Sequence, residues 1–381
     1  MNKKTYRNVF AEAGYSEAEI CRKVQDTFEG IFYGPDRFYH EVGDDMAYME
    51  DTGNHDARTE GMSYGMMMCV QMDRKAEFDR LWKWTKTYMY MEDGVHRGYF
   101  AWSVSPEGVP NAYGPAPDGE EFFAMALLLA SHRWGDGEGI FCYSEEARKL
   151  LHTCIHQEEE TEGGRNMWDL ENHLIRFIPE CDFTDPSYHL PHFYELFGEC
   201  ADEADRPFWK EAAKASRAFL QTACHPKTGL SPEYSYYDGT PMSPEMTTFG
   251  GRHDWYYSDA YRTIANIALD REWFGAEGNE DWHELAAKNL QKFFCETMKD
   301  NDKAIYSVEG EVLGEKALHP IAMTAVNAQA SLAIAAPLTG YALQCVKEFW
   351  ETPLRTGDRR YYDNCLYFFA VLALSGNYRI Y

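Results

Sequence analysis

The sequence lacks the features by which several classes of protein are recognised. No apolar run approaches the roughly 18 residues that a membrane-spanning helix requires. Residues 1–19 are polar and charged, without the apolar stretch of a secretory signal, so we expect no export signal. The 10 cysteines include no C-x-x-C pair, which favours reduced, mostly buried thiols over a disulfide framework. Together these absences predict a cytoplasmic protein without a membrane partner.

Basic residues are also scarce. The chain has 36 Lys and Arg against 62 Asp and Glu, a net charge of −26. Such a surface repels phosphate backbones and anionic lipids, so the composition argues against nucleic-acid and peripheral-membrane roles. Walker A and G-x-G-x-x-G motifs are missing as well, and we therefore predict no nucleotide cofactor.

Aromatic residues are abundant, with 26 Tyr, 22 Phe and 10 Trp in 381 residues. Most of these rings are expected to build a thick core. The surplus of Tyr and Trp, which carry a polar atom on a flat apolar ring, leaves room for a cleft that stacks against sugar rings.

Hydrophobic residues recur along the whole chain with the period of an amphipathic helix. Ser16 and Glu19 have the spacing of a capping box at the start of the first such segment. Alternating β patterns are few, as at 305–308, and the Gly/Pro-rich segments 105–118 and 225–255 are predicted to be functional loops. The periodicity predicts helices near 16–30, 57–72, 75–90, 119–134, 144–156, 187–200, 208–223, 258–270, 280–299, 321–335, 338–350 and 360–374.

Twelve helices suit six helix–loop–helix pairs closed on themselves, an all-α (α/α)6 barrel. An open α-solenoid is the alternative, but no repeat of fixed period is visible. No composition break or low-complexity linker divides the chain, so we predict a single domain over 1–381. Long loops on one rim of such a barrel would build a cleft.

Glu60 stands where a polar loop becomes an apolar helix. Desolvation at such a junction raises the pKa of a carboxyl group toward that of a general acid, although a Glu that complements the helix dipole is an equal alternative. The following G-x-S-x-G match around Ser63 is not a nucleophile elbow, because the segment before it does not read as a buried strand.

Two further acidic positions stand at loop–helix junctions. Asp118, Glu120 and Glu121 exceed what helix capping needs, because carboxylates this close repel unless a cationic or protonated group lies among them. Asp259 lies among aromatic residues, and Arg262 follows one turn later. This pair is either a surface ion pair or a base that orients water beside a cation. Because alternate helices of a barrel begin at the same rim, these carboxylates can converge and hydrolyse a glycosidic bond.

Signals for a metal are weak. His152 and His156 have i, i+4 spacing on a predicted helix, and His189 and His192 are three residues apart, but neither pair has an evident third ligand. We therefore predict no metal and no other cofactor. The acidic run 158–160 is interpreted as a solvated loop.

Several blocks of the sequence form a specific pattern by their length and order. They are EVGDDMAYMEDTGNHDARTEGMSYGMMM (41–68), GYFAWS (98–103), GPAPDGEEFFAMAL (114–127), DPSYHLPHFYELF (185–197), LHP (318–320) and RTGDRRYYDNCLYFFAVLALSGN (355–377). These blocks resemble glycoside hydrolase family 8, and within it the subgroup of reducing-end xylose-releasing exo-oligoxylanases, and the resemblance covers nearly the whole chain. It implies the (α/α)6 barrel and hydrolysis of β-1,4 linkages with inversion at the anomeric carbon.

The resemblance also implies roles for individual residues. Glu60 corresponds to the general acid, Asp259 to the general base, and Asp118 to the carboxylate that holds the −1 sugar in its distorted conformation. The family signature around that last residue reads A-[ST]-D-[AG]-D, so Pro117 and Glu120 are departures, which fit the exo-oligoxylanase subgroup better than an ordinary endoglucanase.

In that subgroup a Leu-His-Pro loop closes the cleft beyond subsite +1, and its His recognises the reducing-end hydroxyl. Leu318, His319 and Pro320 would take these roles here. The remaining predicted substrate contacts are two stacking platforms, Trp102 and Tyr113, and three polar contacts, Arg58, Tyr194 and Tyr361.

The predicted function is therefore an inverting hydrolase that releases xylose from the reducing end of xylo-oligosaccharides of three or more residues. One alternative is an endo-acting β-1,4-xylanase, glucanase or chitosanase on the same scaffold. A non-catalytic carbohydrate-binding protein is the other, against which the presence of all three carboxylates argues. The sequence does not determine the oligomeric state, and a monomer is the expectation.

Overall fold

The structure is a computed structural model that describes residues 5–242, 251–275, 281–314 and 316–381. The chain divides into two compact units. The first contains Met1–Thr27, Phe183–His192 and Ser216–Arg379, and the second contains Phe28–Asp182, Phe193–Ala215 and Ile380–Tyr381. The predicted single domain over 1–381 stays a prediction, and each unit is described by itself.

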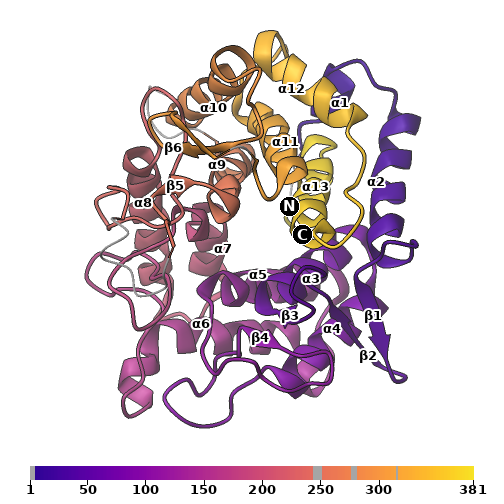
Figure 1. The fold of residues 1–381 in the computed structure, drawn as a ribbon. Helices are drawn as coiled ribbons and strands as arrows, with labels where there is room; N and C mark the ends of the chain where they lie inside the picture. The colour runs from indigo at the N-terminus through magenta and orange to yellow at the C-terminus, as the bar shows by residue number, and fades with distance from the viewer. Residues whose placement is uncertain (1–4, 243–250, 276–280, 315) are drawn as a thin grey trace. The chain divides into compact units, whose positions relative to one another are not determined.

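The second unit contains two short antiparallel pairs of strands and four complete helices (Figure 1). The strands are β1 (Tyr39–Val42), β2 (Met46–Met49), β3 (Ala57–Arg58) and β4 (Ser103–Val104), paired β1–β2 and β3–β4. The helices are α3 (Thr59–Met72), α4 (Lys75–Tyr88), α5 (Pro117–Trp134) and α6 (Tyr143–Glu160), with the 3₁₀ turn η1 (Gly139–Phe141).

The first unit contains a three-stranded sheet and most of the later helices. The sheet has the order β5 (Trp255–Tyr256), β6 (Ile305–Ser307), β7 (Val312–Gly314). The helices are α1 (Val9–Glu12), α9 (Tyr261–Phe274), α10 (Trp282–Lys292), α11 (Pro320–Gln329), α12 (Gly340–Glu351) and α13 (Arg360–Leu374), with the short turns η2 (Pro186–Tyr188), η4 (Ser258–Ala260), η5 (Phe293–Thr297) and η6 (Ala330–Ala333). Three helices contain residues of both units: α2 (Glu17–Phe32), α7 (Pro191–Cys200) and α8 (Arg206–Ala223).

From α2 to α13 the helices alternate between two patterns of burial. The even-numbered helices are amphipathic and bury one face, as α4 does with Phe78, Leu81, Trp82, Trp84 and Thr85. The odd-numbered helices are buried on nearly every side. In α13, for example, every residue from Tyr361 to Leu374 is buried. A helix buried all round must be covered by neighbours on all sides, so this alternation is typical of paired outer and inner helices.

The twelve predicted helices are present in the described residues, with shifted ends. The helix predicted from 119 begins at Pro117, because proline suits the first position of a helix. The one predicted over 280–299 ends in the π-helical turn η5, and its first residue, like 243–250 of the predicted loop 225–255, lies outside the described residues. The predicted capping box is confirmed, since the Ser16 backbone N–H donates to Glu19 Oε2 at 2.8 Å and the Glu19 N–H donates to Ser16 Oγ at 3.4 Å.

All 10 cysteines are free thiols, and half of them are buried. Among the described helices, none combines the length and the apolarity that crossing a membrane requires.

Candidate active site

Glu60 lies in the first turn of α3, directly after strand β3. Arg58 pairs with Ser103 of β4, and the Thr59 backbone N–H donates to the Trp102 carbonyl at 3.0 Å. These backbone bonds fix the direction in which the helix leaves the strand. The Ser63 hydroxyl is buried and donates to the Glu60 carbonyl at 3.0 Å, so Ser63 braces the first turn of the helix. That role agrees with rejecting G-x-S-x-G as a nucleophile elbow.

Arg58 is held by two carboxylates on the preceding loop. Its Nε lies 3.2 Å from Asp51 Oδ2 and 3.1 Å from Asp56 Oδ1. Asp56 also accepts a hydrogen bond from the Ser103 hydroxyl at 2.5 Å, which ties the loop to β4. The guanidinium lies 5.2 Å from the centre of the Trp102 ring, within the range of a cation–π contact. Arg58 therefore orients one predicted stacking platform and remains 28% exposed for a polar contact of its own.

Asp118 lies in the first turn of α5, beside the first turn of α3. A Cβ atom on Gly119 would lie 2.4 Å from Thr59 Cβ, so only glycine allows the two helix starts to approach this closely. α3 and α5 pack along their length (Figure 1). The glycine thus brings together the turns that carry two of the three predicted catalytic carboxylates, Glu60 and Asp118.

Burial favours the neutral form of Glu120, one of the three carboxyl groups at the start of α5. Its side chain is fully buried, and burial, with a smaller contribution from the charge of Asp118, raises its pKa well above the usual value. Its Oε1 accepts a hydrogen bond from the Phe100 backbone N–H at 3.0 Å. Glu121 is buried as well and accepts a hydrogen bond from the Tyr194 hydroxyl at 2.9 Å. The sequence predicts a cationic or protonated group among these carboxylates, and the raised pKa of Glu120 is consistent with that prediction.

The two predicted stacking platforms are exposed. Trp102 is 36% exposed and Tyr113 is 74% exposed, whereas most aromatic rings of the chain are buried. The Tyr113 carbonyl lies 2.9 Å from His96 Nδ1, and His96 Nε2 lies 2.6 Å from Glu180. These contacts hold the Tyr113 backbone while its ring stays open to solvent. By contrast, the predicted polar contact Tyr194 is fully buried, with its hydroxyl on Glu121.

In the first unit, Asp259 lies in the η4 turn that precedes α9. The residue before it, Ser258, has φ of 42°, a left-handed conformation that is strained for a residue other than glycine. The Tyr362 hydroxyl donates to the Ser258 carbonyl at 3.0 Å. Strained backbone clusters at functional sites, where the surroundings hold it in place. Here the strain and the hydrogen bond together determine where the Asp259 side chain projects.

Asp259 has two buried carboxyl neighbours and one buried cation. Arg262 Nη2 lies 3.5 Å from Asp259 Oδ1 and 3.9 Å from Asp185 Oδ2. Burial raises the pKa of Asp185 well above its usual value, despite Arg262, and raises that of Glu233 to about 7. The Asp259 side chain is 36% exposed and can reach water, whereas Asp185 is fully buried. Arg262 is also buried, which excludes the simple surface ion pair considered from the sequence.

His319 precedes α11 and is oriented by Asp363 of α13. His319 Nδ1 lies 3.0 Å from Asp363 Oδ2, and Asp363 Oδ1 accepts the Ala322 backbone N–H at 2.8 Å. Arg355 donates to the Leu318 carbonyl at 2.7 Å and also to Asp363. Because a carboxylate only accepts hydrogen bonds, Nδ1 donates to Asp363, and Nε2 is the nitrogen on the opposite side of the ring. In the tautomer with the proton on Nδ1, Nε2 can accept a hydrogen bond from a hydroxyl group.

The structure groups the predicted residues in two sets. Arg58, Glu60, Trp102, Tyr113, Asp118 and Tyr194 lie in the second unit, and Asp259, Leu318, His319, Pro320 and the buried Tyr361 lie in the first. The structure adds four residues around Asp259 and His319 that the sequence analysis did not predict: Asp185, Glu233, Tyr362 and Asp363. Asp185, Tyr362 and Asp363 stand inside the blocks that carry the family resemblance, but only tertiary contacts reveal what they do.

Comparison with known proteins shows the family of this chain. Residues 43–376 match the sequence profile of Glycosyl hydrolases family 8. The chain is 58% identical over 381 residues to a "Reducing end xylose-releasing exo-oligoxylanase" of Halalkalibacterium halodurans, covering 99% of this chain and 95% of the relative. It is 51% identical over 382 residues to a protein of the same name from Bifidobacterium adolescentis, covering 99% and 98%.

A solved structure has the same fold. Rex8A from Paenibacillus barcinonensis complexed with xylose matches with a TM-score of 0.94 and 56% identity, over 99% of this chain and 98% of that one. This match, with the family profile and the helical content, confirms the predicted all-α (α/α)6 barrel. The chain belongs to glycosyl hydrolases family 8.

Proposed function

We propose that this protein is an inverting glycosidase that releases xylose from the reducing end of β-1,4-xylo-oligosaccharides of three or more residues. The observation that carries the proposal is the orientation of His319. Its Nδ1 donates to Asp363, so Nε2 can accept a hydrogen bond from the hydroxyl group of a reducing-end sugar. The names of the relatives at 51–58% identity support the same activity.

In the proposed reaction, hydrolysis proceeds by a single displacement. Glu60, in its protonated form, donates to the glycosidic oxygen as the bond between that oxygen and the anomeric carbon breaks. Asp259 accepts a proton from water as the water oxygen bonds to the anomeric carbon from the opposite face. Asp118 binds the distorted −1 sugar. The positive charge of Arg262 beside Asp259 suits a base that must be ionised before the reaction.

The exo mode is proposed to follow from the segment Leu318–Pro320. A loop that closes the cleft beyond the +1 sugar leaves no place for a second sugar on the reducing side. Arg355 holds this segment through the Leu318 carbonyl, and Asp363 holds it through His319 and Ala322. These contacts support a rigid barrier.

A timed digestion of xylotriose and xylotetraose tests the proposal, each with its reducing end intact and each reduced to the alditol. We expect one xylose per cut from the intact oligomers and no cleavage of the alditols. Cleavage of both forms into mixed lengths would instead identify an endo-acting enzyme. If no β-1,4-linked oligosaccharide is cleaved, the proposal is wrong and the carbohydrate-binding alternative is favoured.

A cytoplasmic location and a monomeric state belong to the same proposal. Free thiols at all 10 cysteines are usual in a reducing compartment and support the location. An enzyme in that compartment would act on imported oligosaccharides rather than on polymeric xylan.

A further inference from the structure

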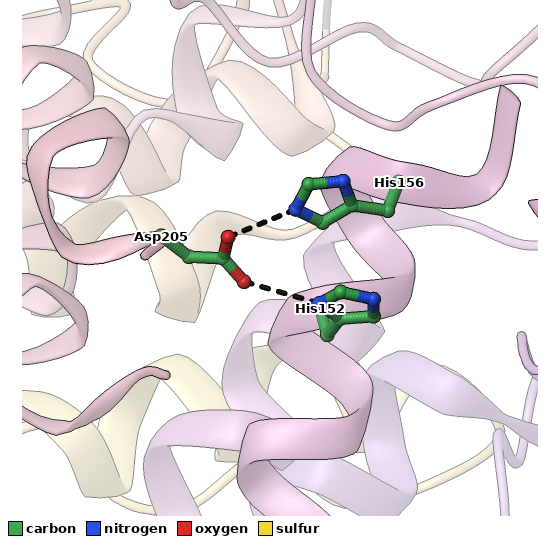
Figure 2. A group of neighbouring side chains, drawn as sticks. All are labelled: His152, His156 and Asp205. Atoms are coloured by element: carbon green, nitrogen blue, oxygen red, sulfur yellow. Dashed lines mark hydrogen bonds and ion pairs between the residues drawn. The ribbon is translucent and has the colours of Figure 1, made fainter. Parts of the chain in front are cut away.

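Two histidines and one aspartate form a compact cluster in the second unit, on residues to which the proposed reaction gives no role. His152 and His156 lie one turn apart on α6, and Asp205 is the residue before α8 (Figure 2). Among the described residues, this is a group whose ligand atoms all lie within 4.8 Å of one another. The sequence shows the histidine pair but not its third member, which is 49 residues beyond His156.

The spacing of the three side chains suits a small cation. Asp205 Oδ2 lies 3.2 Å from His152 Nδ1, and Asp205 Oδ1 lies 2.8 Å from His156 Nε2 (Figure 2). A tetrahedral Zn²⁺ with bonds of about 2.0–2.2 Å separates its ligand atoms by roughly 3.3–3.6 Å. The 3.2 Å contact is close to that range, whereas His156 and Asp205, at 2.8 Å, must move apart by about half an ångström when an ion binds. The side chains of His152 and His156 are 35% and 26% exposed, which leaves solvent access for a water ligand.

The outer nitrogen of each histidine faces a carboxylate. His152 Nε2 lies 2.9 Å from Glu160 Oε1, and His156 Nδ1 lies 3.4 Å from Glu159 Oε2. In metal sites, a carboxylate on the second nitrogen of a ligating histidine orients the ring and makes it a better ligand. These glutamates belong to the acidic run 158–160, which is exposed as the sequence predicts but forms the last residues of helix α6 instead of a loop.

We propose that His152, His156 and Asp205 bind a divalent transition-metal cation of the Zn²⁺ class, with water as a fourth ligand. Imidazole nitrogen favours Zn²⁺ over Ca²⁺ or Mg²⁺, which prefer an all-oxygen shell. Two glutamates around the site and the net charge of −26 attract cations. The cation would link the last turns of α6 to the start of α8 and stabilise that contact.

Without a cation the same geometry would be a network of hydrogen bonds between the histidines and the carboxylates. The test distinguishes the two with untagged full-length protein that has been stripped with EDTA and titrated with ZnCl₂ by calorimetry. We expect saturable binding of one Zn²⁺ per chain. Thermal unfolding should shift upward by roughly 3–5 °C at a hundredfold excess over Kd, because the metal binds the folded state.

Matched variants locate the site. His156→Gln should lower the Zn²⁺ affinity at least 100-fold, and Glu160→Gln should lower it about tenfold, because Glu160 only orients a ligand. His132→Gln removes a histidine in the last turn of α5, where Nδ1 faces the Tyr381 carbonyl, and should keep the wild-type affinity. Since Glu160 lies at a helix end, its variant is expected to fold even if His156→Gln does not.

Two results would overturn the proposal. One is the absence of saturable Zn²⁺ binding to the wild-type chain. The other is a Zn²⁺ affinity that His156→Gln and Glu160→Gln leave unchanged. A loss of affinity in His132→Gln instead would place the ion elsewhere. Neither measurement depends on hydrolysis of an oligosaccharide, so failure of the metal site and failure of the proposed activity are separate outcomes.

Discussion

Tyr362 connects the predicted base with the predicted reducing-end receptor, because it contacts the Ser258 carbonyl and the His319 ring at once. Its hydroxyl donates to the Ser258 carbonyl at 3.0 Å, and its ring centre lies 4.7 Å from that of His319. Ser258 carries the strained φ of 42° directly before Asp259. One side chain of α13 therefore constrains two predicted functions.

Tyr362→Phe should lower kcat about fivefold with little change in KM. The change removes one hydrogen bond of about 1 kcal/mol to the strained turn but keeps the ring beside His319. Steady-state kinetics on xylotriose measures the effect. Tyr367→Phe is the matched control, since that hydroxyl on the same helix donates to the Thr352 carbonyl at 2.8 Å. Equal losses of kcat in both variants would show that the Ser258 contact has no special role.

Glu60→Gln and Asp259→Asn should each lower kcat by about 10²–10⁴-fold, because each removes one proton transfer from the transition state. Both substitutions conserve side-chain volume, so Tm should stay within about 2 °C of the wild-type value. Asp238→Asn, at an exposed turn of the first unit, controls for the loss of one acidic charge. Near-normal turnover in either folded variant would refute the assigned role.

His319→Ala should allow cleavage of xylo-oligosaccharide alditols, because the variant lacks the nitrogen that we propose accepts a hydrogen bond from the reducing-end hydroxyl. Chromatography of the products from xylotetraose and its alditol checks this expectation. Turnover of intact oligomers should fall as well. If the variant still does not cleave the alditols, the segment Leu318–Pro320 excludes them by shape alone.

Gly119→Ala should destabilise the fold by about 1–3 kcal/mol and also lower kcat. The new Cβ would lie 2.4 Å from Thr59 Cβ, so the starts of α3 and α5 must separate, which displaces Glu60 and Asp118. Urea unfolding and steady-state kinetics measure the two effects. Gly114→Ala is the control, because its Cβ would meet only His96 Cε1, at 3.8 Å. An unchanged Gly119→Ala protein would contradict the close approach of these helices.

Glu233→Gln should remove part of the pH dependence of stability. Burial raises the pKa of Glu233 to about 7 in the folded state, from the ordinary 4.5, in a site shared with His253 and the charge of Asp259. A raised pKa favours folding below pH 4.5, and this stabilisation is lost as the pH rises through about 7.

The wild-type protein should therefore match the Gln variant near pH 5 and be less stable than it near pH 8, by up to about 3 kcal/mol. Urea unfolding at the two pH values measures the difference. Parallel pH profiles for the two proteins would show that Glu233 does not titrate in this range.

Much of the fold could be predicted from the sequence, because helix formation depends on local pattern. The period of apolar residues located twelve helices, and Ser16 with Glu19 marked the start of α2, where the capping box is present. Glu60, Asp118 and Asp259 were chosen because each stands at a loop–helix junction and matches a residue of family 8, and their catalytic roles stay predictions.

Tertiary structure alone decided which partners these residues have. Asp363 is 44 residues from His319, and Asp205 is 53 residues from His152, so no spacing rule in the sequence could connect them. Glu120 and Asp185 are ordinary carboxyl groups in the sequence and have raised pKa values because the folded chain removes them from water. Local sequence determined where each helix begins, whereas burial and long-range contacts determined the charge and orientation of the side chains that those helix starts present.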